Sequence, residues 1–241
     1  MSSKWILIST LCYLFINISK ATPRNAILML ADDAGFEMRS YRNKICQAPN
    51  LDKLAKEGLI FNNAYTSVSS CSPSRSAILT GLPSHQNAFH DPHRCGHTNP
   101  EYGNFCEKFG NGDVGMGTIP DWSPIYYQWE QVQLPYFVQD TEAARRDIAA
   151  QYTTISRLDQ GVGLVLKELE NAGLKDDTLV IYTSDNGIPF PNGRTNLYDP
   201  GMAEPMIISS PYHKDRRNQV TYSMTSLLDI APTLLDWFNN L

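Results

Sequence analysis

Several features are absent from this 241-residue sequence, and each absence narrows the class of protein. No stripe of lysine and arginine is present and the formal net charge at pH 7 is −5. A general nucleic-acid binder is therefore excluded, because such proteins use clustered basic residues to replace phosphate counterions. There are also no internal repeats or low-complexity tracts, and 42% of the residues are hydrophobic. This composition is typical of a globular chain with one domain or a little more.

Long hydrophobic runs are missing as well. The longest run, residues 5–16, is shorter than the roughly 20 residues that a membrane-spanning helix needs. It follows Lys4 and precedes Ser19-Lys20-Ala21, whose small residues fit signal-peptidase cleavage after Ala21. We therefore expect residues 1–21 to be a signal peptide that directs the chain into the secretory pathway, with no membrane span. A membrane anchor is the alternative interpretation.

Cysteine is scarce, and no CxxC pair occurs, which argues against a structural zinc site. Removal of the signal peptide would also remove Cys12. Cys95 and Cys106 lie eleven residues apart in a stretch rich in Gly, Asn and Pro, and we predict a disulfide between them. Cys46 could pair with Cys71 in an oxidising compartment, which is one interpretation of Cys71.

Strand and helix patterns alternate along the chain. Apolar runs predict buried strands, and helices are predicted where apolar residues recur near 3.6-residue spacing or where a proline opens and a glycine ends a segment. The predicted strands cover residues 25–31, 179–183 and 206–209; the predicted helices cover residues 51–57, a short segment from Pro73 to Gly81, a long segment after Asp140 that ends by Gly173, and a last segment capped by Asp229. This order predicts an α/β fold with a mainly parallel sheet flanked by helices over residues 22–241.

Acidic and amide side chains follow two of the predicted strands. Asp32 and Asp33 come directly after the first strand, and Asp185 and Asn186 follow the strand over residues 179–183. Either pair alone is a common feature of strand-to-loop boundaries. Ligands of such sheets collect beyond the carboxyl ends of the strands, so the two pairs could converge there. Four oxygen-bearing side chains suit a hard divalent cation such as calcium or magnesium better than zinc.

The pentapeptide Cys71-Ser72-Pro73-Ser74-Arg75 is unusual for a secreted chain. The proline and the apolar residues behind it predict that Cys71 lies just ahead of a helix N-terminus, where backbone N–H groups and the helix dipole favour anions. Arg75 is expected in the first turn of that helix. The alternative interpretation is a capped helix with a thiol that has no role, but it leaves the cysteine itself unexplained.

This pentapeptide, followed by Leu79-Thr80-Gly81, resembles the signature of the sulfatase family, in which the cysteine is oxidised to formylglycine in the endoplasmic reticulum. The pairs Asp32-Asp33 and Asp185-Asn186 stand before and after it in the order that sulfatases use. Longer stretches, such as FHDPHRCGH and TSDNGIPFPNGRTNLYDPG, are similar to the branch of the family that removes N-linked sulfate from the glucosamine of heparan sulfate. The likeness runs from about residue 25 to residue 238.

The resemblance implies an alkaline phosphatase/sulfatase-like fold and a set of site residues. The implied ligands of one Ca²⁺ are Asp32, Asp33, Asp185, Asn186 and the formylglycine made from Cys71. A hydroxyl of the hydrated aldehyde would attack sulfur and form a covalent sulfate ester while the amine leaves, and Arg75 would stabilise the developing charge. His93 would protonate the leaving nitrogen, Asp91 would contact the amine or the sugar, and Arg194 would contact the sulfate or the sugar.

The resemblance also implies partners and a location. The substrate would be a saccharide derived from heparan sulfate that carries N-sulfoglucosamine, the formylglycine-generating enzyme would modify the chain, and the lysosome would be its destination. Both a monomer and a homodimer remain open. Another sulfatase or a phosphohydrolase with the same sheet is an alternative activity.

The sequence also departs from the family pattern. After Asn87 a sulfatase continues for several dozen residues that include a Lys-x-His element, and no Lys-x-His occurs in this chain. We therefore expect an internal deletion between Asn87 and Ala88, and we expect the small C-terminal domain to be missing beyond Leu241. Apart from Asn17-Ile18-Ser19 there is no glycosylation sequon. An inactive, shortened sulfatase is thus a further hypothesis.

Overall fold

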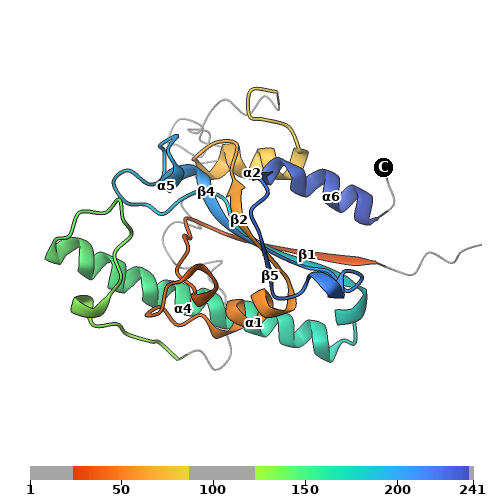
Figure 1. Ribbon diagram of the computed structural model, residues 1–241, viewed down its shortest axis with the longest axis horizontal. Helices are drawn as coiled ribbons and strands as arrows, with labels where there is room; N and C mark the ends of the chain where they lie inside the picture. Colours follow the sequence, from red (N-terminus) through yellow and green to blue (C-terminus); the bar gives the residue numbers. More distant parts are fainter. Residues whose placement is uncertain (1–23, 87–122, 239–241) are drawn as a thin grey trace, which may run out of the picture.

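The computed structural model describes residues 24–86 and 123–238, which form one sheet with helices on both faces (Figure 1). The predicted signal peptide, the junction at Asn87, the pair Cys95 and Cys106, and the candidates Asp91 and His93 all lie outside the described residues. The strands are β1 (Asn25–Ala31), β2 (Leu59–Tyr65), β3 (Thr178–Ser184), β4 (Ala203–Ser209), β5 (Gln219–Thr221) and β6 (Thr225–Ser226). The helices are α1 (Pro49–Glu57), α2 (Cys71–Thr80), α4 (Glu142–Asn171), α5 (Asp199–Met202) and α6 (Ile230–Trp237).

The sheet has the strand order β1-β3-β4-β2-β5, and β6 pairs with β2. β1 and β3 are parallel, with Asn25 opposite Thr178 and Ala31 opposite Ser184. β4 is antiparallel to both of its neighbours, β3 and β2, whereas β5 and β6 are parallel to β2. Every described strand except β4 therefore runs in the same direction, which confirms the predicted mainly parallel sheet.

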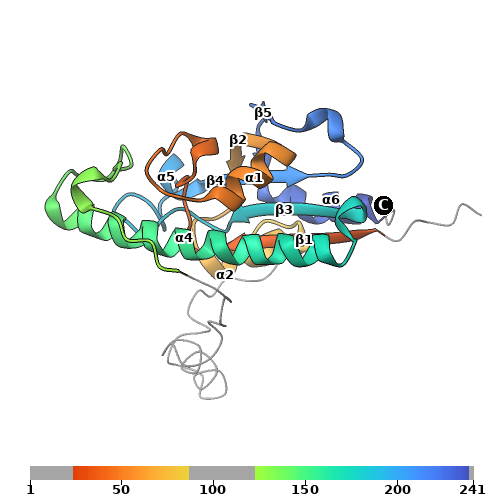
Figure 2. The same ribbon diagram turned by 90° about the horizontal axis from the view of Figure 1, so that it is seen from below.

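Two helical layers enclose the sheet. α1 and α4 lie on one side of it and α2 and α6 on the other (Figure 1), and Figure 2 shows α4 extending along the sheet. All seven residues of β3 are buried. Val180 and Tyr182 belong to the core under α1 and α4, while Leu179 and Ile181 pack in the core with α6. This burial on both faces explains why β3 reads as a continuous apolar run.

Local signals account for the helix boundaries. Thr141 caps α4 by accepting a hydrogen bond from the Ala144 N–H at 3.1 Å. α2 ends at Gly81, whose φ of 67° is left-handed and whose N–H donates to the Ala77 carbonyl at 2.9 Å. Such a C-terminal cap favours glycine because a side chain is strained at positive φ. No described helix is both long and apolar enough to cross a bilayer.

Two features differ from the sequence-based expectations. β2 was not predicted, because Asn62 and Asn63 interrupt its apolar pattern, and the pairing with β4 shifts register between Phe61 and Ala64. The side chain of Asp229 does not cap α6 directly. It accepts a hydrogen bond from the Ser226 N–H at 3.0 Å and so closes the short turn that leads into the helix.

Candidate active site

The carboxyl ends of β1 and β3 lie side by side and bring together the pairs Asp32-Asp33 and Asp185-Asn186. The Asp33 N–H donates to Oδ1 of Asp185 at 3.2 Å. The Asn186 Nδ2 donates to Oδ1 of Asp33 at 2.6 Å. The convergence follows from the parallel register of the two strands, because the residues after Ala31 and Ser184 leave the sheet at the same edge.

Cys71 joins this group from α2, in the helical layer that α2 and α6 form. It is the first residue of α2, and its Sγ lies 3.6 Å from Oδ1 of Asp33. Possible ligand atoms of Asp32, Asp33 and Cys71 all lie within 4.8 Å of one another. The helix thus begins two residues before Pro73, where its start was expected, and Arg75 falls just beyond its first turn rather than within it.

Two arginines face the carboxylates. The Arg75 Nη2 lies 2.6 Å from Oδ1 of Asp32 and 2.7 Å from Oδ2 of Asp185, so this guanidinium bridges the ends of both strands. The Arg194 Nη1 donates to Oδ2 of Asp33 at 2.8 Å. Arg194 is therefore held at the strand ends and is not a free loop arginine. Each of the three carboxylates contacts one guanidinium.

The loop that carries Arg194 is fixed by two close contacts. The Thr195 N–H donates to the carbonyl and to Oγ of Ser69, both at 2.9 Å, which ties this loop to the start of α2. At Gly187 an added Cβ would lie 1.9 Å from the Pro200 carbonyl oxygen. Only glycine fits there, so the Asn-Gly sequence after β3 follows from the close approach of the backbone.

Ser74 supports the site, although sequence reasoning did not identify it. Its Oγ donates to the Asp185 carbonyl at 2.6 Å and lies 2.7 Å from Oγ1 of Thr66, and the residue is fully buried. It stands three residues after Cys71, on the face of α2 directed at the sheet. That spacing is the only signal in the sequence that could have revealed it.

Protonation states at the site are set mainly by burial. Burial, followed by the charges of Asp33, Asp185 and Asp32, raises the pKa of the Cys71 thiol to about 12. The thiol is therefore neutral near pH 7 and a poor nucleophile. Burial also raises the pKa of Asp185, although the Asp33 N–H and Arg75 oppose the shift. Negative charge is thus disfavoured here unless more positive charge is supplied.

The donor set fits a hard divalent cation. Asn186 is fully buried, and its Oδ1 has no hydrogen-bond partner among the described residues. A buried carbonyl oxygen without a partner is costly, and a metal ion would satisfy it. Together with the carboxylates of Asp32, Asp33 and Asp185 it provides the all-oxygen environment that calcium prefers.

The second interpretation of Cys71, a disulfide with Cys46, is contradicted by the structure. Both cysteines are free thiols. Cys46 is buried in the core beneath α4, with its Sγ 3.9 Å from the Tyr152 carbonyl oxygen. Cys71 instead lies at the strand ends.

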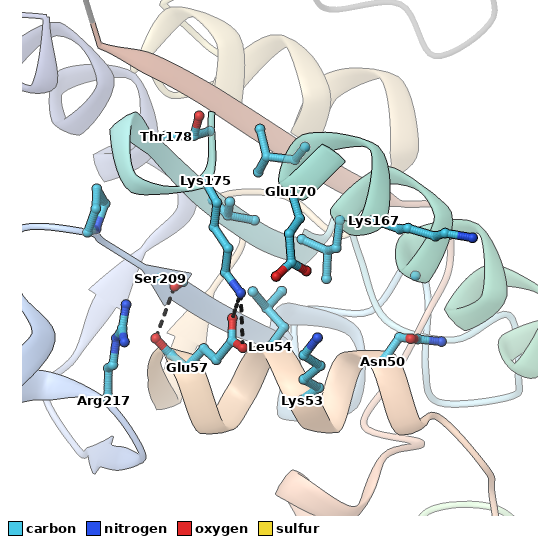
Figure 3. Close-up of a pocket in the computed structure, with 15 residues that line it drawn as sticks. Asn50, Lys53, Leu54, Glu57, Lys167, Glu170, Lys175, Thr178, Ser209 and Arg217 are labelled. Atoms are coloured by element: carbon cyan, nitrogen blue, oxygen red, sulfur yellow. Dashed lines mark hydrogen bonds and ion pairs between the residues drawn. The ribbon is translucent and has the colours of Figure 1, made fainter. Parts of the chain in front are cut away.

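A cavity of about 290 Å³ between α1 and α4 is separate from the candidate active site (Figure 3). It lies near Thr178, the first residue of β3, at the opposite end of the strand from Asp185. Inside it, the Lys175 Nζ forms an ion pair with Oε2 of Glu57 at 3.2 Å, and the Ser209 Oγ donates to the Glu57 carbonyl at 3.0 Å. Glu57 is thus paired with both Lys175 and Ser209 inside the cavity.

A buried carboxyl near the site gives a stability prediction. Burial raises the pKa of Glu37 from 4.5 to about 7, and Cys46, Tyr152, Tyr182 and Glu204 are close enough to interact electrostatically with it. Below pH 4.5 the carboxyl is protonated in both the folded and the unfolded chain, whereas above about pH 7 only the folded chain bears the cost of a buried charge.

We expect Glu37→Gln to increase the free energy of unfolding at about pH 8 by about 1–3 kcal/mol. The increase should shrink to nearly zero near pH 4.5, as measured by urea unfolding at the two pH values. The exposed Glu130→Gln is the matched control and should change stability by less than about 0.5 kcal/mol at either pH. An equal effect of Glu37→Gln at both pH values would show that ionisation of Glu37 is not its cause.

Known proteins resemble this chain in sequence and in fold. A sequence profile of the sulfatase family matches residues 24–119 and 88–240. The chain is 46% identical to N-sulphoglucosamine sulphohydrolase of Homo sapiens over 315 residues, covering 94% of this chain and 63% of that protein. It is 22% identical to the ulvan-active sulfatase of Formosa agariphila over 309 residues, covering 88% of this chain and 51% of that one. Its fold is similar to the phosphonate monoester hydrolase of Agrobacterium radiobacter, with a TM-score of 0.68, 16% identity, and coverage of 90% and 74%.

The alignments also bear on the expected internal gap. The region matched to the human relative is 315 residues long, whereas the whole chain has 241, so the relative contains residues without a counterpart here. The second match of the family profile begins at residue 88, where the sequence departs from the family pattern. The chain spans about 63% of the length of the human relative. With the profile matching most of its length, the chain belongs to the sulfatase family.

Proposed function

We propose that this chain carries the catalytic centre of a sulfohydrolase that removes N-linked sulfate from glucosamine residues of heparan sulfate. The observation that carries the proposal is the meeting of Cys71 with the ends of β1 and β3, where its Sγ lies 3.6 Å from Asp33. The 46% identity to a human N-sulphoglucosamine sulphohydrolase supports the N-sulfated substrate.

Two groups that the family uses would act at this centre. Asp32, Asp33, Asp185 and Asn186 fit as ligands of one calcium ion, and formylglycine would arise from Cys71. When present, calcium would supply positive charge for the sulfate oxygens and formylglycine an oxygen nucleophile toward sulfur. Because the unmodified Cys71 thiol is neutral near pH 7, the thiol itself does not serve as that nucleophile.

The described side chains would bind the substrate and orient the carboxylates of the centre. Arg75 contacts both Asp32 and Asp185 at 2.6–2.7 Å and so holds the two carboxylates next to each other. Its positive charge would help to stabilise the negative charge that develops on the sulfate oxygens. Arg194 fixes Asp33 in the same way. Burial of Asp185 and Asn186 keeps water away from the inner side of the centre. His93 and Asp91, which lie outside the described residues, are proposed to protonate the leaving nitrogen and to contact the sugar.

The internal gap favours a second function for this form, namely a shortened sulfatase with little or no turnover. The absent Lys-x-His element is the observation behind it. For the chain as it stands, entry into the secretory pathway through residues 1–21, modification by the formylglycine-generating enzyme and delivery to lysosomes are parts of the same proposal.

The proposed substrate is tested by comparing glucosamine derivatives that carry N-sulfate, O-sulfate or phosphate. We expect any turnover by the formylglycine-bearing chain to be confined to the N-sulfated compound and to be lost in Cys71→Ala. The matched control Cys46→Ala should leave the selectivity unchanged, since Cys46 lies in the core away from the site. Preference for the O-sulfated or phosphorylated compound would assign a different activity to the same fold.

A further inference from the structure

A second cavity, of about 550 Å³, opens beside the candidate active site. Its walls come from the segment after β1, from β2, from residues 133–137 and from the loop after β3. Gly35 and Gly187 line it, two residues after Asp33 and one after Asn186 respectively. The cavity therefore borders the metal-binding edge of the sheet without including any of its proposed ligands.

Aromatic rings form much of the wall. Phe36, Tyr65 and Phe137 line the cavity, and Tyr136 stands at its mouth with 84% of its surface exposed. Flat rings around a concave space, interrupted by a few polar groups, are typical of small-molecule sites. An exposed tyrosine at such a mouth can cover the apolar face of a sugar ring.

A buried carboxyl borders this space, and one of its two oxygens lacks a hydrogen-bond partner. Glu37 lines the cavity and is 5% exposed, and its Oε2 makes no hydrogen bond to any described residue. The backbone of Gly35 and of Glu37 itself holds the same carboxyl. An unpaired buried acceptor is destabilising, and a ligand with N–H or O–H donors would remove that cost.

The charges around the cavity indicate what kind of donor fits. The carboxyls of Glu37 and Asp199 line it, and among the described residues no lysine or arginine does. The side chains of Asp199 and Gln133 make no hydrogen bond within the described part of the chain, so both are available to a ligand. Such a site disfavours sulfate and carboxylate groups and favours hydroxyls and a positively charged amine.

We propose that this cavity binds an amino sugar through its free ammonium and hydroxyl groups, with Glu37 accepting from the ligand and Tyr136 packing against its ring. This proposal rests on the proposed function in one respect, namely the source of the amino sugar. Removal of N-linked sulfate from glucosamine yields a free amine, so the cavity would hold the product class next to the centre that forms it.

The test measures binding of glucosamine and N-acetylglucosamine by calorimetry at about pH 7.5. We expect glucosamine to bind at least about tenfold more tightly than the acetylated sugar, since the acetyl group removes the charge. Glu37→Gln should weaken glucosamine binding about tenfold and remove this preference, and Tyr136→Ala should weaken both sugars. Tyr126→Ala, which removes an aromatic ring of similar exposure (79%) from outside the cavity, should change neither.

Cys71→Ala separates this proposal from the proposed function. It should abolish sulfohydrolase activity and leave glucosamine binding unchanged, because neither probe contains sulfate and Cys71 does not line the cavity. Equal affinity for the two sugars, or glucosamine binding that is insensitive to both Glu37→Gln and Tyr136→Ala, would overturn the amino-sugar site.

Discussion

Inserting between residues 87 and 88 the segment that the human relative has at this place should raise turnover of N-sulfoglucosamine by roughly ten-thousand-fold or more. The family resemblance implies that this segment supplies a lysine and a histidine that hold the sulfate. Each lost charge-stabilising contact typically costs about 2.7–4 kcal/mol of barrier. Arg75 and Arg194 do not replace them, because each already contacts carboxylates of this chain at 2.6–2.8 Å.

The comparison is made between two purified proteins that both carry formylglycine and differ only in the inserted segment. A second inserted form, in which the Lys and the His of the Lys-x-His element are replaced by Gln, is the matched control. It should restore the chain length without restoring the rate. If the 241-residue chain were as fast as the restored protein, this interpretation of the gap would be wrong.

Asp185→Asn should lower calcium affinity by about a hundredfold or more. Asp185 is fully buried at the end of β3, accepts from the Asp33 N–H and contacts Arg75 at 2.7 Å. The substitution removes a full negative charge from the centre while keeping the size of the side chain. In the unchanged chain, calcium at a hundred times its dissociation constant should stabilise the fold by about 2.7 kcal/mol, and the same calcium concentration should stabilise the variant by only about 0.4 kcal/mol or less.

Calcium titration followed by calorimetry, with thermal unfolding at each concentration, measures both effects. Asp176→Asn is the matched control, since Asp176 precedes β3 at the opposite end and is exposed. It should leave calcium binding unchanged. Retention of full calcium affinity in Asp185→Asn would remove this residue from the ligand set.

The arrangement of the site at the ends of β1 and β3 could be predicted from the sequence because each strand is an apolar run followed by two side chains that carry oxygen ligands, Asp32-Asp33 or Asp185-Asn186. Burial on both faces forces such runs, and parallel strands leave the sheet at one edge. Cys71 could be added because a proline two residues later marks the start of a helix. These local signals agree with the fold, so they suffice to predict this part of the site.

Other parts depend on contacts that no local pattern encodes. The antiparallel direction of β4 depends on the course of the connection that precedes it, and the interior position of β2 is hidden by Asn62 and Asn63. The hydrogen bond from Arg194 to Asp33 depends on how the loop that follows β3 packs. The hydrogen bond from Ser74 to Asp185 depends on how α2 packs. Glu37 reads as an ordinary polar loop residue until the fold buries it.

Whether Cys71 is the precursor of a formylglycine at a sulfatase centre can be measured directly by peptide mass spectrometry. The chain is expressed together with the formylglycine-generating enzyme, and the peptide that contains Cys71 to Arg75 is isolated. We expect a peptide whose mass shows that the thiol has been replaced by an aldehyde, and Cys46 should remain a free thiol. A peptide that contains only unmodified Cys71, or that is joined to Cys46 by a disulfide, would contradict it.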